Sequence, residues 1–369
     1  MKTIYYGVAG EGRGHAARTQ GIVDVLRQRY RVALFSSGQA HDLLRQVYHD
    51  SEVALHEIPG LEFGYDRHGR QSYWITGLQV PGTALRGWRT IDTLTRCFRD
   101  DPPDLIISDF EPLLPRVARR LRIPYLLLDH QSFLLDYDLS HLPWQLRSRL
   151  PFLRSIVRLL YGWGEQRRVC SSFFFPPLRR GCTRTVQVGV MLREAVRRIP
   201  PRDGGFLLVY MRRHLSPALE RALRAQPLPV RIYGIGEQPA RDNLRFCPVD
   251  TERFVADLAS CRALVATAGN TLVGEALYLQ KPILALPEPG NVEQLIHAHF
   301  IAHSGCGEVA DPATVDAATV QNFLARLGQF RPYTHRHRLQ GLEATIEAIE
   351  QTLEQLITTE VTCYSEPGD

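Results

Sequence analysis

A run of small and polar residues, 267–277, carries the residue types of an anion-binding turn. It follows the apolar run 263–266, which is typical of a buried parallel strand, and it continues with helical spacing. In such a turn Gly269 lets a phosphate approach closely, and the backbone amides of Asn270 and Thr271 and the Thr271 hydroxyl can donate to it. The positive end of the helix dipole adds to this attraction. The segment therefore predicts a phosphate site.

Carboxylate and amide side chains follow this turn at positions suited to a sugar. Glu275 lies one turn into the expected helix, where its carboxylate can accept hydrogen bonds from the two vicinal hydroxyls of a ribose. Glu293 and Gln294 come just past the next strand, 281–287, and are expected to face the same cleft. A strand, a glycine and a helix are by themselves usually a connector, but these added groups favour a binding site. Phosphate and ribose together indicate a nucleotide, and we expect a nucleotide-sugar.

A second glycine-rich turn, 10–15, follows the first expected strand and ends in a histidine. Gly10, Gly12 and Gly14 let the backbone turn sharply near a ligand, and Gly12 is a candidate donor-binding residue. His15 would begin a helix at the top of the sheet, where a neutral imidazole can act as a general base near pH 7. The alternative is a histidine that caps a tight turn.

Asp109 ends another strand of the same sheet. Strand ends converge on one edge of a doubly wound sheet, so Asp109 could reach His15 and orient its ring, as in serine hydrolases. The competing interpretation makes Asp109 the cap of a helix beginning at Pro112. Glu111 and Asp129 are further candidates for the carboxylate beside the histidine.

Two other strand ends are expected at the cleft. Strand 206–210 is followed by Arg212, whose guanidinium can neutralise a diphosphate, although a solvated surface arginine fits equally well. Strand 244–247 leads to Val249, whose backbone can bond the edge of a base. NAD is not expected, because the second strand ends in 35–38 without the acidic residue of the dinucleotide fingerprint.

Alternating strand and helix patterns over 369 residues predict an α/β fold with two Rossmann-like, doubly wound parallel sheets. Residues 52–88 look irregular or β-rich, a helix is expected near 88–99, and 173–175 resembles a strand. We expect four parts: an N-terminal domain, a C-terminal domain, a terminal helix that can return to the first domain, and a disordered tail, covering 1–185, 186–337, 338–358 and 359–369.

The composition is that of an ordinary globular protein, with 44% hydrophobic and 22% charged residues. A net charge of +5, mostly from arginine, favours phosphate ligands or an anionic surface, and no nucleic-acid-binding module is recognisable. Seven scattered cysteines without Cys-x-x-Cys spacing argue against a disulfide framework or a zinc site and fit a reducing cytosol. The chain enters strand pattern at residue 3 without a leader, so we expect a cytoplasmic protein.

Residues 144–163 combine large apolar side chains with arginines. An amphipathic helix of this composition could lie on an anionic membrane, at its inner face in the cell. More often such a stripe packs against the protein's own core. Both interpretations stay open at this point.

These motifs together resemble the inverting glycosyltransferases of the GT-B fold. The donor-site pattern is similar to that of UDP-glycosyltransferases and of the bacterial N-acetylglucosaminyltransferase that makes lipid II, over 269–277, 281–282 and 293–294. A likeness to a microbial group called teichoic-acid-biosynthesis-like covers most of the chain, from 7–15 through 103–112 to 305–309.

The resemblance implies two domains facing a cleft, with His15 in the place of the catalytic base and Asp109 as its support. It also implies that Glu275 binds the ribose and that Gln294 is the glutamine of the late donor motif. Residues 267–268 stand where the plant-type motif has histidine and tryptophan, and 211–213 replace the glycine-serine phosphate loop of many relatives. The identity of the donor therefore does not follow from the resemblance.

We expect a metal-independent, inverting transfer of a sugar from a nucleoside diphosphate, with UDP favoured, to an acceptor hydroxyl. No cofactor is expected beyond the sugar donor, and the acceptor is unknown, a lipid-linked one being compatible with the basic stretch. The triplet 136–138 could hold a divalent metal but fits a polar loop better. Two alternatives are a nucleotide-sugar epimerase and a non-catalytic nucleotide-sugar-binding subunit of a membrane-associated complex.

Overall fold

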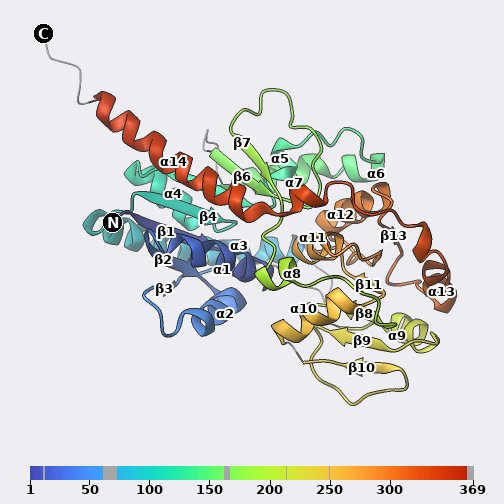
Figure 1. The fold of residues 1–369 in the computed structure, drawn as a ribbon. Coiled ribbons are helices and arrows are strands. Elements are labelled where there is room, and N and C mark those ends of the chain that lie inside the picture. Colours follow the sequence, from blue (N-terminus) through green and yellow to red (C-terminus); the bar gives the residue numbers. More distant parts are fainter. Residues whose placement is uncertain (11–12, 61–72, 162–166, 213, 249, 364–369) are drawn as a thin grey trace, which may run out of the picture.

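The computed structural model places two parallel β-sheets, each flanked by helices on both faces (Figure 1). It describes residues 1–10, 13–60, 73–161, 167–212, 214–248 and 250–363; within these, the side chains of 13, 73–86, 161 and 356–363 are not described. Two parallel sheets with alternating helices are the architecture that the sequence pattern predicted.

The first sheet has seven strands in the order β3-β2-β1-β4-β5-β6-β7, and all neighbours pair in parallel. Strand β1 is buried along its whole length, so its side chains pack into a core on each face of the sheet. Ile4 and Tyr6 pack on one face against helices α1, α2 and α14, and Tyr5 packs on the other against α3 and α4. The strands are β1 (Thr3–Val8), β2 (Arg31–Ser36), β3 (Ala54–Glu57), β4 (Leu105–Asp109), β5 (Tyr125–Asp129), β6 (Arg167–Ser171) and β7 (Thr185–Val188).

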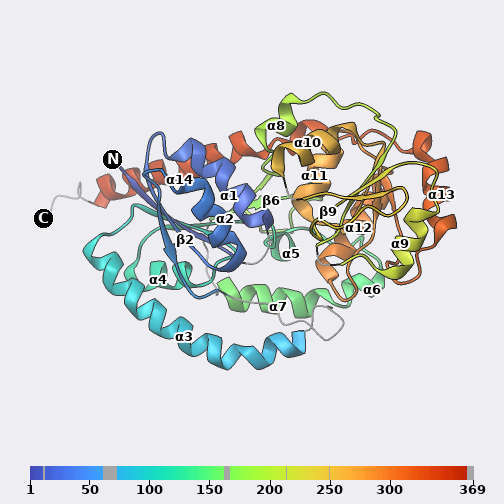
Figure 2. The same ribbon diagram turned by 90° about the horizontal axis from the view of Figure 1, so that it is seen from below.

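The helices of this half include one long outer helix, α3, which runs beside α4 at the edge of the molecule (Figure 2). They are α1 (Arg13–Leu26), α2 (Gly38–Tyr48), α3 (Tyr73–Asp100), α4 (Leu113–Leu121), α5 (Phe133–Asp136), α6 (Trp144–Arg147) and α7 (Leu150–Tyr161). A connector with the short helix α8 (Glu194–Arg198) leads to the second half.

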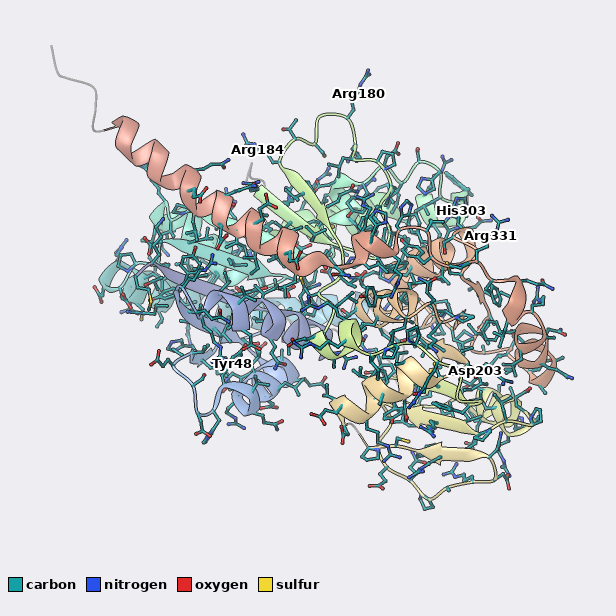
Figure 3. The ribbon with its side chains drawn as sticks, in the orientation of Figure 1. Tyr48, Arg180, Arg184, Asp203, His303 and Arg331 are labelled. Carbon is teal, nitrogen blue, oxygen red and sulfur yellow. The ribbon has the colours of Figure 1, made fainter. Side chains whose placement is uncertain are left out.

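The second sheet has six parallel strands in the order β10-β9-β8-β11-β12-β13. They are β8 (Leu207–Tyr210), β9 (Val230–Tyr233), β10 (Leu244–Phe246), β11 (Ala263–Ala266), β12 (Ile283–Ala285) and β13 (Gly307–Val309). Its helices are α9 (Pro217–Arg224), α10 (Thr251–Ser260), α11 (Asn270–Tyr278), α12 (Val292–His303) and α13 (Ala317–Ala325). The last residue of α12, His303, lies at the surface (Figure 3).

The last long helix, α14 (Gly341–Cys363), returns across the first half and lies along α1 and β7 (Figure 1). Ala348, Ile349 and Leu353 are buried in the same core as the strands of the first sheet. Arg29 donates to Glu350 at 2.6 Å across this contact. The short 3₁₀ turn η2 (Arg336–Leu339) precedes the helix, which ends five residues beyond the predicted 358, and residues 364–369 lie outside the described part of the chain.

Two predictions of secondary structure were wrong. The stretch 52–88, expected to be irregular or β-rich, does contain the strand β3, but it also contains the start of α3. The later residues Ile91, Leu94 and Phe98 of α3 pack into a core, and this packing outweighs the low helix propensity of its glycines. The run 173–175 is not a strand, because Phe173 and Phe174 fill a core shared by both halves. Residues 61–72, between β3 and α3, lie outside the described residues. Among the helices that the structure describes, none is long and apolar enough to cross a membrane.

Candidate active site

The first turn of α1 brings His15 to the end of β4. His15 Nδ1 lies 2.9 Å from Asp109 Oδ1. The Asp109 side chain is fully buried, whereas His15 keeps 17% of its side chain exposed. With the proton on Nδ1, the ring donates to Asp109 and its Nε2 carries the lone pair that a general base needs. The two residues thus form a dyad whose histidine reaches the open space above the sheet.

Arg18 is part of this arrangement, although the sequence motifs did not point to it. Its Nε donates to Asp109 Oδ2 at 2.9 Å, and a second guanidinium nitrogen contacts Asp109 Oδ1 and lies 3.0 Å from His15 Nδ1. Burial by itself raises the pKa of Asp109, but the charges and hydrogen bonds of Arg18 and His15 outweigh it and lower that pKa. Asp109 is therefore a carboxylate at neutral pH. The position of Arg18, three residues after His15 on one helix face, was the available signal.

The competing carboxylates have other contacts. Glu111 accepts from the backbone N–H groups of Leu113 and Leu114 at 2.6 and 2.8 Å, so Glu111, and not Asp109, satisfies the start of α4. Asp129 accepts from the N–H and the hydroxyl of Ser132, at 2.6 and 3.0 Å. Neither carboxylate is hydrogen-bonded to the histidine.

Helix α11 begins at the edge of the second sheet, and its first residues lie against the first half. Gly269 precedes it, and no side chain of the described residues caps the helix. The first-turn N–H groups therefore remain for water or an anion. The Asn270 side chain instead ties the two halves together, because it donates to Ser171 O at 3.1 Å and accepts from Phe173 N at 3.2 Å.

Glu275 lies one turn further along α11 and is 1% exposed. Arg193, from the connector between the halves, donates to both of its oxygens at 2.7 and 2.6 Å. Each carboxylate oxygen has a second lone pair, so Glu275 can still accept from ribose hydroxyls beside this arginine. Nothing in the spacing of the sequence signals Arg193, because the connector has no periodic pattern.

The first turn of α12 carries Glu293 and Gln294, which were expected to bind the donor. The Gln294 side chain folds back onto Glu288: its Oε1 accepts from Glu288 N at 2.7 Å and its Nε2 donates to Glu288 Oε2 at 3.3 Å. Glu293 faces the cavity instead, beside Gln131, at 3.5 Å from its Nε2. Burial raises the pKa of Glu293. Of the two, Glu293 is the more available to a ligand.

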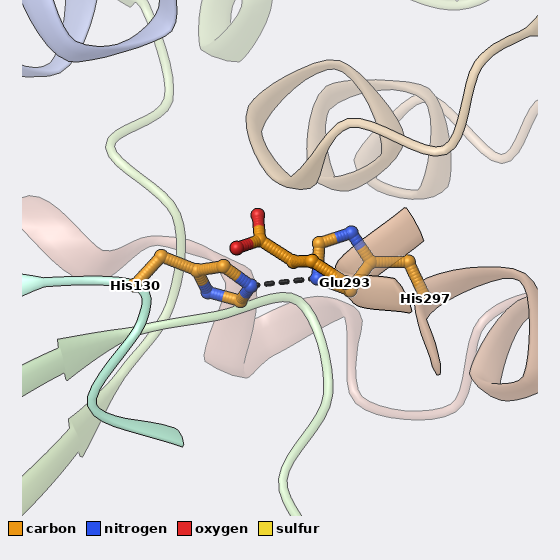
Figure 4. Close-up of side chains that lie close together, drawn as sticks. All are labelled: His130, Glu293 and His297. Carbon is orange, nitrogen blue, oxygen red and sulfur yellow. Dashed lines mark hydrogen bonds between the residues drawn. The ribbon is translucent and has the colours of Figure 1, made fainter. Parts of the chain in front are cut away.

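A pair of buried histidines joins the halves just below Glu293 (Figure 4). His130, after β5, and His297, on α12, place their Nε2 atoms 2.7 Å apart. Burial lowers the pKa of both imidazoles, that of His297 to about 4. Both rings are therefore neutral near pH 7.

One cavity of about 420 Å³ brings these groups together between the sheets. Eight of the predicted site residues line it: His15, Arg212, Gly269, Asn270, Thr271, Glu275, Glu293 and Gln294. Asp109 lies behind His15, and Gly12 and Val249 fall outside the described residues. The cavity also has an aromatic side formed by Tyr210, Tyr233 and Phe254. A larger, shallow hollow of about 710 Å³ lies at the opposite, amino edge of the second sheet, around Asp203 and Arg262, and gathers no comparable set of groups.

The triplet 136–138 is structural. Asp136 is buried and accepts from Thr185 at 2.8 Å and from Arg168 at 3.1 Å. Tyr137 is fully buried, and Asp138 accepts from the backbone of Ser140 at 3.0 Å. The two carboxylates have separate partners, but the triplet is not the polar loop that was expected, because Asp136 ends α5 and Tyr137 is buried.

Comparison with protein families identifies the chain. Residues 2–328 match the model of glycosyl transferase family 1. The protein belongs to this family. A glycosyltransferase of Methanosarcina mazei is 23% identical to it over 96% of this chain and 98% of that one, and one of Methanosarcina acetivorans is 21% identical over 98% and 99%. The chain is therefore a glycosyltransferase.

Solved glycosyltransferases share its fold. The calicheamicin glycosyltransferase CalG4 superposes with a TM-score of 0.66 at 17% identity, over 96% of this chain and 98% of that one. MurG of Acinetobacter baumannii gives 0.62 at 14% identity, over 95% and 100%, and UGT89C1 of Arabidopsis thaliana, complexed with UDP-L-rhamnose, gives 0.66 at 14%, over 96% and 99%. This family member thus has the GT-B fold that its sequence motifs implied.

Proposed function

We propose that this glycosyltransferase moves a sugar from a nucleoside diphosphate, with UDP as the favoured nucleotide, to an acceptor hydroxyl with inversion at the anomeric carbon. The observation that carries the proposal is the meeting of the His15–Asp109 dyad and the uncapped start of α11 in one cavity. They come from different halves, yet a Cβ added to Gly14 would lie 3.8 Å from Thr271 Oγ1. Gly14, the neighbour of His15, thus lies beside the start of α11, and a single displacement needs its base and its anion site in one cavity.

In the proposed reaction, His15 Nε2 removes the proton of the acceptor hydroxyl as the oxygen attacks the anomeric carbon. Asp109 stabilises the imidazolium that forms. The diphosphate departs toward the amides at the start of α11, which are already oriented for its growing charge. Arg212 lines the same cavity and supplies a positive charge, while Glu275 accepts from the ribose.

We propose that no metal is needed at the diphosphate, because helix amides and arginine can take the role of a hard cation. Varying Mg²⁺ or Mn²⁺ in the assay should leave the rate unchanged within about two-fold. Loss of activity on removing these ions, restored by adding them back, would contradict this part. A sample treated with EDTA and then given Zn²⁺ serves as the control for effects unrelated to the diphosphate.

The identity of the donor's nucleotide is tested first, by thermal shift with UDP-, GDP- and dTDP-sugars. A ligand at 100 times its dissociation constant adds about 2.7 kcal/mol of stability. The stabilising donor is then incubated with candidate acceptors, and NMR of the product gives the anomeric configuration. Retention would overturn the mechanism. An isomerised donor in the absence of acceptor would instead indicate an epimerase.

We further propose contact with an anionic membrane, which would present a lipid-linked acceptor. The proposal is supported by apolar side chains that α6 and α7 expose: Trp144 by 69%, Phe152 by 55% and Leu159 by 72%. The exposed Arg147 and Arg149 stand beside them. The opposite face of α7 packs into the core, so one helix can pack on the protein and still offer its outer face to a membrane. Trp163 lies outside the described residues.

A further inference from the structure

The two histidines between the halves present an electrostatic conflict. His130 Nδ1 lies 2.7 Å from Ser171 O, and His297 Nδ1 lies 2.6 Å from Ala268 O. A carbonyl only accepts, so each Nδ1 must carry a proton and donate. Each neutral ring then has a bare lone pair on Nε2, and these two lone pairs point at each other across 2.7 Å. A cation must lie between or beside them for the arrangement to be stable.

A proton is one such cation, but its site opposes it. Both rings are at most 2% exposed and stand among the aromatic side chains of Phe133, Phe173 and Phe174. A proton shared by the rings would place an imidazolium in this apolar layer, at a large desolvation cost. A transition-metal ion accepts both lone pairs directly and asks for neutral imidazoles, which is the state that burial favours.

Glu293 completes a ligand set. One oxygen of Glu293 and one nitrogen of each histidine all lie within 4.8 Å of one another. Glu293 and His297 are four residues apart on α12, so they project from one face of the helix. In each ring the Nδ1–H donates to a backbone carbonyl. Metal-binding histidines are commonly oriented in this way. Near the cluster, Gln131 Oε1 is shut off from solvent and has no partner among the described residues.

We propose that His130, Glu293 and His297 bind a divalent transition ion of the Zn²⁺ class, which fastens the two halves together at the floor of the cavity. Two nitrogens on a tetrahedral zinc ion stand about 3.3 Å apart, so the rings open slightly to admit it. Because His130 and Glu293 line the cavity, the fourth position faces it and takes water. The second oxygen of Glu293 stays on the cavity side. This site does not depend on the proposed sugar transfer.

The test measures metal binding without using activity. The full chain is stripped with a chelator and titrated with Co²⁺, whose visible absorption reports a four-coordinate site, and then with Zn²⁺ in competition. We expect one ion per chain and, in E293Q and H297Q, an affinity reduced at least ~10-fold. H303Q is the matched control: it removes the exposed histidine of the other pair on α12, His299 and His303, and should bind as the wild type does.

Far-UV circular dichroism and thermal unfolding verify that each variant folds. If H297Q does not fold, E293Q, whose side chain lies at the cavity wall, still tests the site. Absence of the cobalt spectrum in the wild type would overturn the proposal. So would cobalt binding by both E293Q and H297Q with the affinity of the wild type. Loss of binding in H303Q would move the ion to the surface. A low-field proton resonance between the rings that persists in excess Zn²⁺ would assign the gap to a shared proton.

Discussion

Arg193 holds both carboxylate oxygens of Glu275, so the predicted ribose ligand is fastened to the connector between the halves. The side chain of Glu275 is 2% exposed and that of Arg193 25%. A buried carboxylate needs a compensating charge, and Arg193 supplies it while leaving lone pairs for a ligand.

The pair can be tested by a double-mutant cycle. Arg193→Leu leaves the buried charge of Glu275 unpaired and should cost about 3 kcal/mol of unfolding free energy. Glu275→Gln should weaken donor binding roughly 10- to 100-fold, because a charged acceptor is lost. Chemical denaturation and calorimetry measure the two effects. If the double variant is as unstable as the sum of the singles, the residues are not coupled.

The His15–Asp109 dyad predicts a loss of rate. His15→Ala should lower kcat about 10²- to 10⁴-fold at nearly unchanged donor affinity, because the base acts on the acceptor. Asp109→Asn should also lower kcat strongly, since the His15 ring loses the carboxylate that supports it. Asp129→Asn is the control: it removes a carboxylate at the neighbouring strand end that contacts Ser132 instead. Steady-state kinetics with wild-type-like turnover in His15→Ala would exclude the histidine as the base.

Glu111 predicts a dependence of stability on pH. Burial raises its pKa from 4.5 to about 7, against the opposing effect of two backbone hydrogen bonds. The folded state therefore binds this proton more tightly than the unfolded state. The stabilisation is fully present below pH 4.5 and is lost as the pH rises to about 7. In Glu111→Gln, whose amide oxygen can still accept from the start of α4, the fall should be smaller. Urea unfolding at several pH values in this range measures the free energy of unfolding of both proteins. If this free energy fell equally with pH in the wild type and in Glu111→Gln, the prediction would be wrong.

Two glycines of the donor segment predict opposite outcomes. A Cβ on Gly274 would lie 2.5 Å from Val190 Cγ2. Valine is stiff, so Gly274→Ala should destabilise by about 1–3 kcal/mol despite its gain in helix propensity. A Cβ on Gly269 meets no described atom within 4 Å, so Gly269→Ala should lose at most about 1 kcal/mol, from the poorer N-cap, but weaken donor binding several-fold. Melting temperature and donor affinity separate the two, and unchanged affinity in Gly269→Ala would argue against close phosphate approach.

Membrane contact predicts cosedimentation with anionic vesicles. Changing Trp144, Phe152 and Leu159 to serine should abolish it, because these exposed side chains would enter the interface. The exposed Val309, at the end of β13 and outside the cavity lining, is the control for general loss of apolar surface. Binding by the triple variant equal to that of the wild type would rule out this surface.

The motifs of this chain were visible in its sequence because local backbone requirements fix them. A buried strand, a glycine and a helix start were predicted within a dozen residues, and they form β11, Gly269 and the start of α11. The binding of an anion there stays a prediction. Alternation of strands and helices likewise predicted both sheets, since the pattern is set by burial on each face.

Only the tertiary structure determined which groups meet. Arg18 could have been suspected from its helical spacing to His15, but Arg193 comes from a connector without a pattern. His130 and His297 stand 167 positions apart and meet because two sheets pack their carboxyl edges against a common aromatic core. Such long-range pairs depend on the relative placement of two domains, which no local periodicity encodes. The same packing explains why 173–175 is not the expected strand: Phe173 and Phe174 are buried in the core between the halves.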